Sequence, residues 1–154
     1  MKEKKYKYAK LLLESVVLKD KKYLFVEYPK ILKPFIDILK EALKEYKDKT
    51  AYFFEVDSFK RRDLMLELDL ENILKHPLFD KSIYNKYAKL DAAFLFISSY
   101  IPHLMDNVKA EVIKEVTKHE RMTSKAFRDM YEGNKLNWCI AGAANPYWAE
   151  DLHM

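Results

Sequence analysis

Residues 92–97 read Ala-Ala-Phe-Leu-Phe-Ile, an apolar run with the aromatic and β-branched content of a strand buried on both faces. Three other short runs share this character: residues 23–26 (YLFV), 51–56 (AYFFEV) and 136–141 (LNWCIA). Segments with a helical period separate the runs. Strands joined by helical crossovers pair in parallel, so we predict an α/β fold with three layers: a mostly parallel sheet of four or slightly more strands, flanked by helices.

The connecting segments predict helices at residues 6–17, 31–46 and 107–131, and two or three shorter helices between 58 and 90 that are interrupted at His76-Pro77. Pro34 falls in a first helical turn, where a missing N–H costs little. Ser58 is the expected N-cap of the helix after the second strand. Gly133 is expected to end the long helix in a left-handed conformation.

Composition limits the classes of function. The chain of 154 residues has a net charge of +4, but most of its lysines alternate with Asp and Glu and only four residues are Arg. That pattern is typical of a solvated helix face and argues against a nucleic-acid partner. No apolar run approaches the roughly 20 residues of a membrane span. No apolar signal core follows the charged amino terminus, so we expect a cytoplasmic protein without membrane contact.

Motifs for common chemistries are missing. The sequence has only two glycines, and neither follows the first strand, where a nucleotide-binding loop would need them. His119-Glu120 begins like a zinc-protease motif, but Thr123 stands where the second histidine should be. The remaining histidines show no ligand spacing, and we interpret them as surface or loop residues: His76, His103 and His153. The lone Cys139, within an apolar strand, is interpreted as a buried, inert thiol.

Two polar segments follow predicted strands at their carboxyl ends, where open α/β sheets bind ligands. These are Asp57-Ser58 and Ser98-Ser99-Tyr100. Helix capping and loop hydrogen bonds are the interpretation we favour for both, since Asp and Ser are common caps. A small-ligand site beyond Ser58 and Ser98 stays open as a weaker hypothesis.

Residues 134–149 read NKLNWCIAGAANPYWA, in which a Trp-containing strand precedes a small-residue turn and a Pro-x-Trp-Ala helix start. This stretch resembles the aminopeptidase T/aminopeptidase S family of metallo-aminopeptidases. Residues 92–99, 101–105, 121–126 and 8–12 also fit the family in place and order, so the resemblance spans nearly the whole chain. It implies an amino-terminal α/β domain that precedes a second domain, where two divalent metals, zinc or cobalt, activate water. No metal-ligand position of the family falls in this sequence, so we assign no catalytic, cofactor-binding or metal residue.

From this resemblance we expect residues 1–145 to form the amino-terminal domain of a metal-dependent aminopeptidase and residues 146–154 to begin the connection to a catalytic domain. The chain alone would be inactive on peptides, and its expected partners are that domain and, in the complete enzyme, a second copy. Trp138 and Trp148 are expected as core or domain-interface anchors. An exposed patch at Tyr147, Trp148 and Leu152 would receive the catalytic domain. The alternative is a stand-alone, non-catalytic binding or interaction module.

Overall fold

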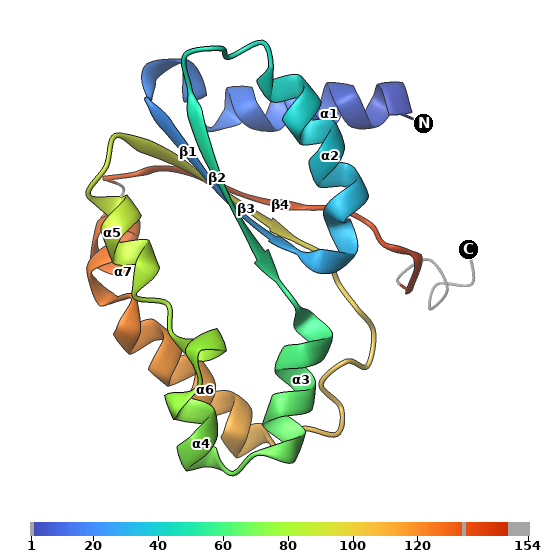
Figure 1. The fold of residues 1–154 in the computed structure, drawn as a ribbon, viewed down its shortest axis with the longest axis vertical. Coiled ribbons are helices and arrows are strands. Elements are labelled where there is room, and N and C mark those ends of the chain that lie inside the picture. The colour runs from blue at the N-terminus through green and yellow to red at the C-terminus, as the bar shows by residue number, and fades with distance from the viewer. Residues whose placement is uncertain (1, 134, 148–154) are drawn as a thin grey trace. The chain divides into compact units, whose positions relative to one another are not determined.

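The computed structural model describes residues 2–133 and 135–147, and the chain divides into two compact units. The first unit holds a four-stranded sheet, whose strands are β1 (Tyr23–Pro29), β2 (Thr50–Val56), β3 (Ala92–Ser98) and β4 (Asn137–Gly142). Their order across the sheet is β2-β1-β3-β4, and every neighbouring pair is parallel (Figure 1). The predicted α/β class and the parallel four-stranded sheet flanked by helices are confirmed.

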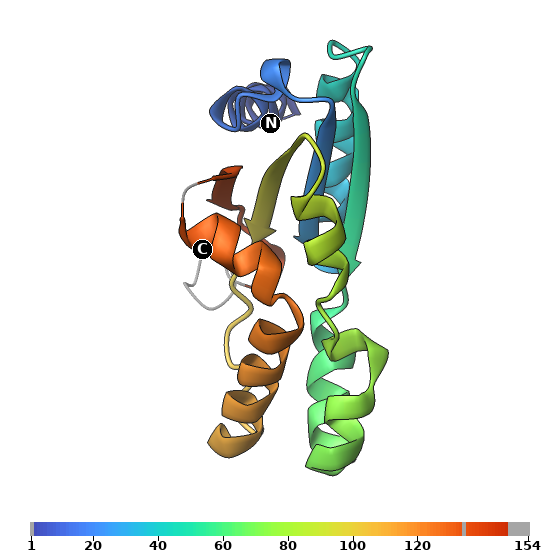
Figure 2. The ribbon, with the colours of Figure 1, turned by 90° about the vertical axis from the view of Figure 1, so that its left-hand side faces the viewer.

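One face of the sheet packs against two helices, α1 (Lys2–Ser15) and α2 (Lys33–Leu43), which also contact each other (Figure 2). The apolar stripe of α1 buries Ala9, Leu12 and Leu13. Alternate strand residues turn toward these helices, because successive side chains of a strand point to opposite faces. On the two central strands these are Leu24, Val26, Tyr28, Ala93, Leu95 and Ile97.

The opposite face of the sheet carries aromatic residues. Phe25 stacks on Phe54 of β2, with ring centroids 4.5 Å apart, and lies 5.4 Å from Phe94 of β3. Phe25 and Phe94 are fully buried. The central strands β1 and β3 are therefore apolar on both faces, as the sequence predicts.

The edge strands β2 and β4 differ from that prediction, since most of their side chains are half-buried or exposed. Each has only one neighbouring strand to cover it. Cys139 is accordingly half-buried rather than buried, and Trp138, opposite Phe94 in the sheet register, is also only partly covered. The prediction failed for β2 and β4 because burial depends on which strands lie at the edges of the sheet, and a single sequence does not reveal the strand order.

The second unit is helical and contains two segments, Asp57–Lys89 and His103–Lys135. Its α-helices in the described residues are α3 (Ser58–Glu67), α4 (Leu70–Lys75), α5 (Ile83–Ala88), α6 (Ala110–Thr123) and α7 (Lys125–Glu132). The predicted interruption at His76-Pro77 is confirmed, because a short 3₁₀ turn, η3 (Pro77–Phe79), follows α4 there. Ile73, Phe79 and Val116 centre its core.

The long helix predicted for residues 107–131 is in fact two helices that meet at Ser124. The hydroxyl groups of Thr123 and Ser124 both donate to the Glu120 carbonyl, at 3.0 and 2.8 Å. Asn85 then bridges the break. Its Nδ2 donates to the Thr123 carbonyl at 2.7 Å, and its Oδ1 accepts from the Phe127 N–H at 2.9 Å. Two backbone groups that the break leaves without helical partners are thereby satisfied.

Two predicted helix ends differ from the structure. The N-cap of α3 is Asp57, whose carboxylate accepts from the Lys60 N–H at 3.1 Å, and Ser58 is the first helical residue. Gly133 follows α7 with φ −82°, so the chain leaves the helix without the left-handed glycine expected there. Pro34 does lie in the first turn of α2, preceded by the 3₁₀ turn η2 (Lys30–Leu32). None of the helices in the described part of the chain is long and apolar enough to cross a bilayer.

Candidate functional site

The carboxyl edge of the sheet is the natural place for a ligand. The chain runs from β1 outward to β2 and then returns to the other side of β1 for β3, so the strand order reverses between β1 and β3. Open α/β sheets bind ligands in the crevice outside the carboxyl ends of the strands at such a reversal. Residues after β1, β3 and β4 meet at this edge.

A cleft of about 370 Å³ opens there, between the beginning of α2 and the segment that follows β4. Its lining is mainly apolar and includes Ile31, Leu32 and Phe35. Lys5 of α1 contributes a cation, and Tyr147, whose residue surface is 48% exposed, contributes an aromatic side chain. Such a cleft offers apolar contact and one positive charge to a ligand.

Asn145 holds the cleft wall in place. This residue is only 5% exposed, and its Nδ2 donates to Ser99 Oγ at 2.6 Å and to the Tyr100 carbonyl at 2.7 Å. Ser99 Oγ in turn donates to the Ala143 carbonyl at 2.5 Å. The network ties the loop after β3 to the loop after β4, so Ser99 and Asn145 position the backbone.

The polar segments singled out in the sequence are not brought together as one ligand site. Because β1 lies between β2 and β3, the ends of those two strands are not neighbours in the sheet. Asp57 caps α3, and Ser98 Oγ lies 3.4 Å from the Ala141 carbonyl, to which it donates. Capping and loop bonding, the favoured interpretation, describe Asp57, Ser98 and Ser99, whereas Ser58 has no capping bond.

Two buried or half-buried tyrosines near the sheet act as hydrogen-bond donors. Tyr28 donates to Glu55 at 3.1 Å, and burial followed by this bond raises the pKa of its phenol. Tyr8 donates to the Gly142 carbonyl at 2.9 Å, and burial raises its pKa as well. Both phenols therefore stay protonated at neutral pH, when neither can serve as a base.

The sequence points to the carboxyl edge of the sheet, where the cleft lies, but not to the residues that shape the cleft. Lys5 and Tyr147 are separated by almost the whole chain, and only the packing of α1 beside β4 relates them. The sequence does contain a signal that could have identified Asn145 as a residue that bonds to the backbone. It stands just before Pro146 in a turn after a strand, where an Asn side chain commonly bonds to nearby backbone.

The model of the thermophilic metalloprotease family, M29, matches residues 1–154, which is the whole chain. The chain belongs to this family. The resemblance seen in the Trp-containing strand and the Pro-x-Trp-Ala segment is thereby confirmed, although Trp148 and Leu152 of the expected patch lie outside the described residues.

A solved structure also supports the fold. Wild-type AmpT from Thermus thermophilus superposes with a TM-score of 0.84 at 19% sequence identity, over 97% of this chain. The chain spans 38% of the length of AmpT. At this identity the likeness shows the fold alone. A search of curated proteins found no match.

Full enzymes of a metalloprotease family use metal, so the metal-binding capacity of the described residues matters. Among them, no three His, Cys, Asp or Glu side chains are grouped so that they could hold a metal ion. Glu120 of the partial motif is instead engaged by two cations, Arg61 at 2.8 Å and Lys81 at 3.6 Å. Since Arg61 also donates to the Leu78 carbonyl at 3.2 Å, this cluster joins α6 to α3 and η3.

Two of the three described histidines, His76 and His103, have structural surroundings that the contacts define. His76 Nδ1 accepts from the Leu78 N–H at 3.1 Å and so caps η3. His103 is exposed and lies 2.8 Å from Asp106. Both agree with the predicted surface and loop roles, and His153 lies outside the described residues.

Proposed function

We propose that this chain is the amino-terminal α/β portion of a metal-dependent aminopeptidase, which removes residues from the amino terminus of peptides. The observation that carries the proposal is the family match over residues 1–154. The fold likeness to AmpT supports it, since this chain covers 38% of that protein. In this proposal, hydrolysis belongs to a catalytic domain that the sequence does not contain.

The metal chemistry of the complete enzyme would lie in that domain. Two divalent ions, zinc or cobalt, would supply activated water and stabilise the charge that develops on the peptide carbonyl. The described residues here do not fit such a centre, because they offer no ligand cluster. We therefore assign this chain no step of the reaction.

This portion would instead support the catalytic domain. The cleft at the carboxyl edge has an apolar lining and an exposed Tyr147, which suits contact with another protein surface. We propose that the cleft receives the catalytic domain and that the complete enzyme forms a homodimer. The chain would then help to shape the access of peptide substrates.

The test begins with the reading frame beyond codon 154. The protein that the complete frame encodes is purified and assayed with zinc or cobalt on a peptide with a free amino terminus and on its acetylated counterpart. We expect release of the first residue from the free peptide only, and loss of this activity with a chelator. Residues 1–154 alone should release nothing. Hydrolysis by this shorter chain, or none by the complete protein, contradicts the proposal.

A second candidate is a stand-alone, non-catalytic interaction module, which would use the same cleft to bind a partner protein without any metal. The reading frame beyond codon 154 separates the two candidates. An immediate stop codon, together with a stable protein of 154 residues that binds a partner, would support the module. A continuing frame rich in Glu, His and Asp would support the aminopeptidase.

A further inference from the structure

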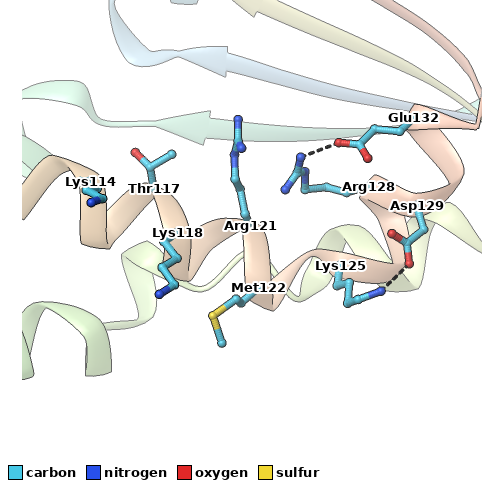
Figure 3. Close-up of a pocket in the computed structure, with 9 residues that line it drawn as sticks. All are labelled: Lys114, Thr117, Lys118, Arg121, Met122, Lys125, Arg128, Asp129 and Glu132. Atoms are coloured by element: carbon cyan, nitrogen blue, oxygen red, sulfur yellow. Dashed lines mark hydrogen bonds and ion pairs between the residues drawn. The ribbon is translucent and has the colours of Figure 1, made fainter.

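A groove of about 650 Å³ runs along one surface of α6 and α7 in the helical unit (Figure 3). Its central lining comes from α6 and the first residue of α7: Lys114, Thr117, Lys118, Arg121, Met122 and Lys125. Figure 3 shows Arg121 pointing to one side of this surface and Lys118 and Met122 to the other. The groove belongs entirely to the second unit.

Five cations line this groove: Lys114, Lys118, Arg121, Lys125 and Arg128. The first three stand at i, i+4 and i+7 of α6, so they form a row on one face of that helix. At 1.5 Å of rise per residue this row is about 10 Å long, and Lys125 follows it at the start of α7, beyond the break at Ser124. No acidic residue interrupts it, and the first acidic lining residue is Asp129 of α7.

Three of the five lining cations have no ion-pair partner among the described residues: Lys114, Lys118 and Arg121. The two cations of α7 are paired, Lys125 with Asp129 at 2.8 Å and Arg128 with Glu132 at 2.5 Å. Glu120, the acid nearest in sequence to Arg121, is held by Arg61 and Lys81 instead. The local charge is therefore uncompensated, and like charges at i, i+4 repel each other.

Other helices pair lysines with acids along their surfaces, as the sequence predicts. Lys7 pairs with Glu3 within α1, and Lys75 pairs with Glu71 within α4. The row on α6 instead places three successive unpaired cations on one helix face. A row of cations that the chain does not neutralise itself is complementary to an acidic partner.

Met122 indicates which kind of acidic partner fits. Its residue surface is 66% exposed beside the row, so an apolar contact is available next to the charges. A protein side chain can use that contact, and exposed Met is common at protein-binding surfaces. Only one unpaired Arg in the row offers a bidentate phosphate contact, which argues against a nucleic-acid partner.

We propose that the α6–α7 groove docks an acidic amphipathic helix of a partner protein. Carboxylates at i, i+4 and i+7 of that helix meet Lys114, Lys118 and Arg121, and an apolar side chain beside them covers Met122. The interaction is independent of peptide hydrolysis, so its test does not depend on whether the aminopeptidase proposal is correct.

The test uses the full chain and a fluorescent helical peptide of about four turns. The peptide carries Glu at these three positions and Leu between them, and a matched peptide carries Gln in place of Glu. We expect saturable binding of the Glu peptide by fluorescence anisotropy and clearly weaker binding of the Gln peptide. Binding should weaken as salt rises, because about 1 M salt shortens the screening length to roughly 3 Å.

Matched protein variants localise the binding. The variant K114Q/K118Q/R121Q should bind the Glu peptide about tenfold more weakly, since three exposed ion pairs are lost. The variant K4Q/K44Q/K47Q removes the same charge from exposed lysines outside the groove and should bind as the native chain does. Both variants are first shown by circular dichroism and thermal unfolding to keep the native fold. Met122→Gln should also weaken binding, by a smaller factor.

Three results would overturn the proposal. These are no saturable binding of the Glu peptide, equal affinity in the two triple variants, or a single-stranded oligonucleotide that binds more tightly than the peptide and is lost in K114Q/K118Q/R121Q. The last result would assign the groove to nucleic acid instead of protein.

Discussion

Asn85 joins two helices through both ends of one carboxamide, so at the residue scale its loss should lower stability. Asn85→Ala removes the partners of the Thr123 carbonyl and the Phe127 N–H. We expect the free energy of unfolding to fall by about 2 kcal/mol, because half-buried backbone groups would lack hydrogen bonds. Urea unfolding measures the change. Asn72→Ala, at an exposed position in α4, is the control and should be close to neutral. Equal effects of the two substitutions would contradict the bridging role.

Val17 adopts a backbone conformation that does not suit its side chain. It lies after α1 with φ 51° and ψ 48°, the left-handed region, which is uncommon for β-branched residues. Asn tolerates this region better than Val, so Val17→Asn should stabilise the chain by up to about 1 kcal/mol. The increase would appear as a higher urea midpoint. Val16→Asn serves as the contrast, since Val16 is only 1% exposed and should lose stability. A loss of stability in Val17→Asn would argue against a strained left-handed residue.

At the scale of elements, the helix that carries the cationic row begins without a side-chain cap. Its N-cap residue is Lys109, which forms no capping hydrogen bond. Lys109→Asp should stabilise the chain by about 1 kcal/mol, because a carboxylate there can accept from a free N–H of the first turn. Lys109→Gln removes the same positive charge without an equally good cap. Thermal unfolding of both variants distinguishes the effect of the cap from the effect of the lost charge. Equal increases in Tm for the two variants would contradict the capping effect.

A comparison of the predicted and observed helices and strands indicates what the sequence could and could not predict. The four parallel strands follow from apolar runs separated by helical segments, and Pro34 correctly marks a first helical turn. The break at Ser124 was missed, because no Pro or Gly stands there. Its only local sign is Thr123-Ser124, a pair whose hydroxyls compete for helix carbonyls, and the decisive bonds come from Asn85 in another helix.

The candidate site was predictable only in part, for a similar reason. The carboxyl edge of the sheet follows from the α/β class, but the cleft depends on strand order and on Lys5, which reaches the edge through the packing of α1. The uncompensated cations of the groove were hidden because acids alternate with them along the sequence. Only the structure shows that Glu120 turns toward Arg61 and Lys81.

At the scale of the whole molecule, alkaline pH should weaken the unit that contains the sheet. The tyrosines with raised pKa, Tyr6, Tyr8 and Tyr28, all belong to it. A raised pKa in the folded state means that folding favours the protonated phenol. The stabilisation of the folded state by these phenols is therefore complete below about pH 10, the pKa of an unfolded tyrosine. The stabilisation is lost as the pH rises through the folded-state pKa values.

Tyr28→Phe tests this dependence. The variant lacks the bond to Glu55 and should be less stable than the native chain at neutral pH, but the difference should narrow as the pH rises above about 10. Urea unfolding at a series of pH values measures the difference. Tyr100→Phe, which removes an exposed phenol, is the control for a general effect of substitution. A constant difference between the native chain and Tyr28→Phe would contradict the prediction.

The interleaving of the two units has a consequence for synthesis on the ribosome. The helical unit is encoded within residues 57–135, whereas the sheet is complete only once β4 (Asn137–Gly142) has been made. The helical unit can therefore close on the nascent chain while β3 still has one unpaired edge. Until β4 leaves the ribosome, that edge and the apolar Phe94 and Phe96 beside it are open to pairing with other chains. Among the four described strands, β4 is translated last, and its pairing with β3 therefore protects the sheet from aggregation.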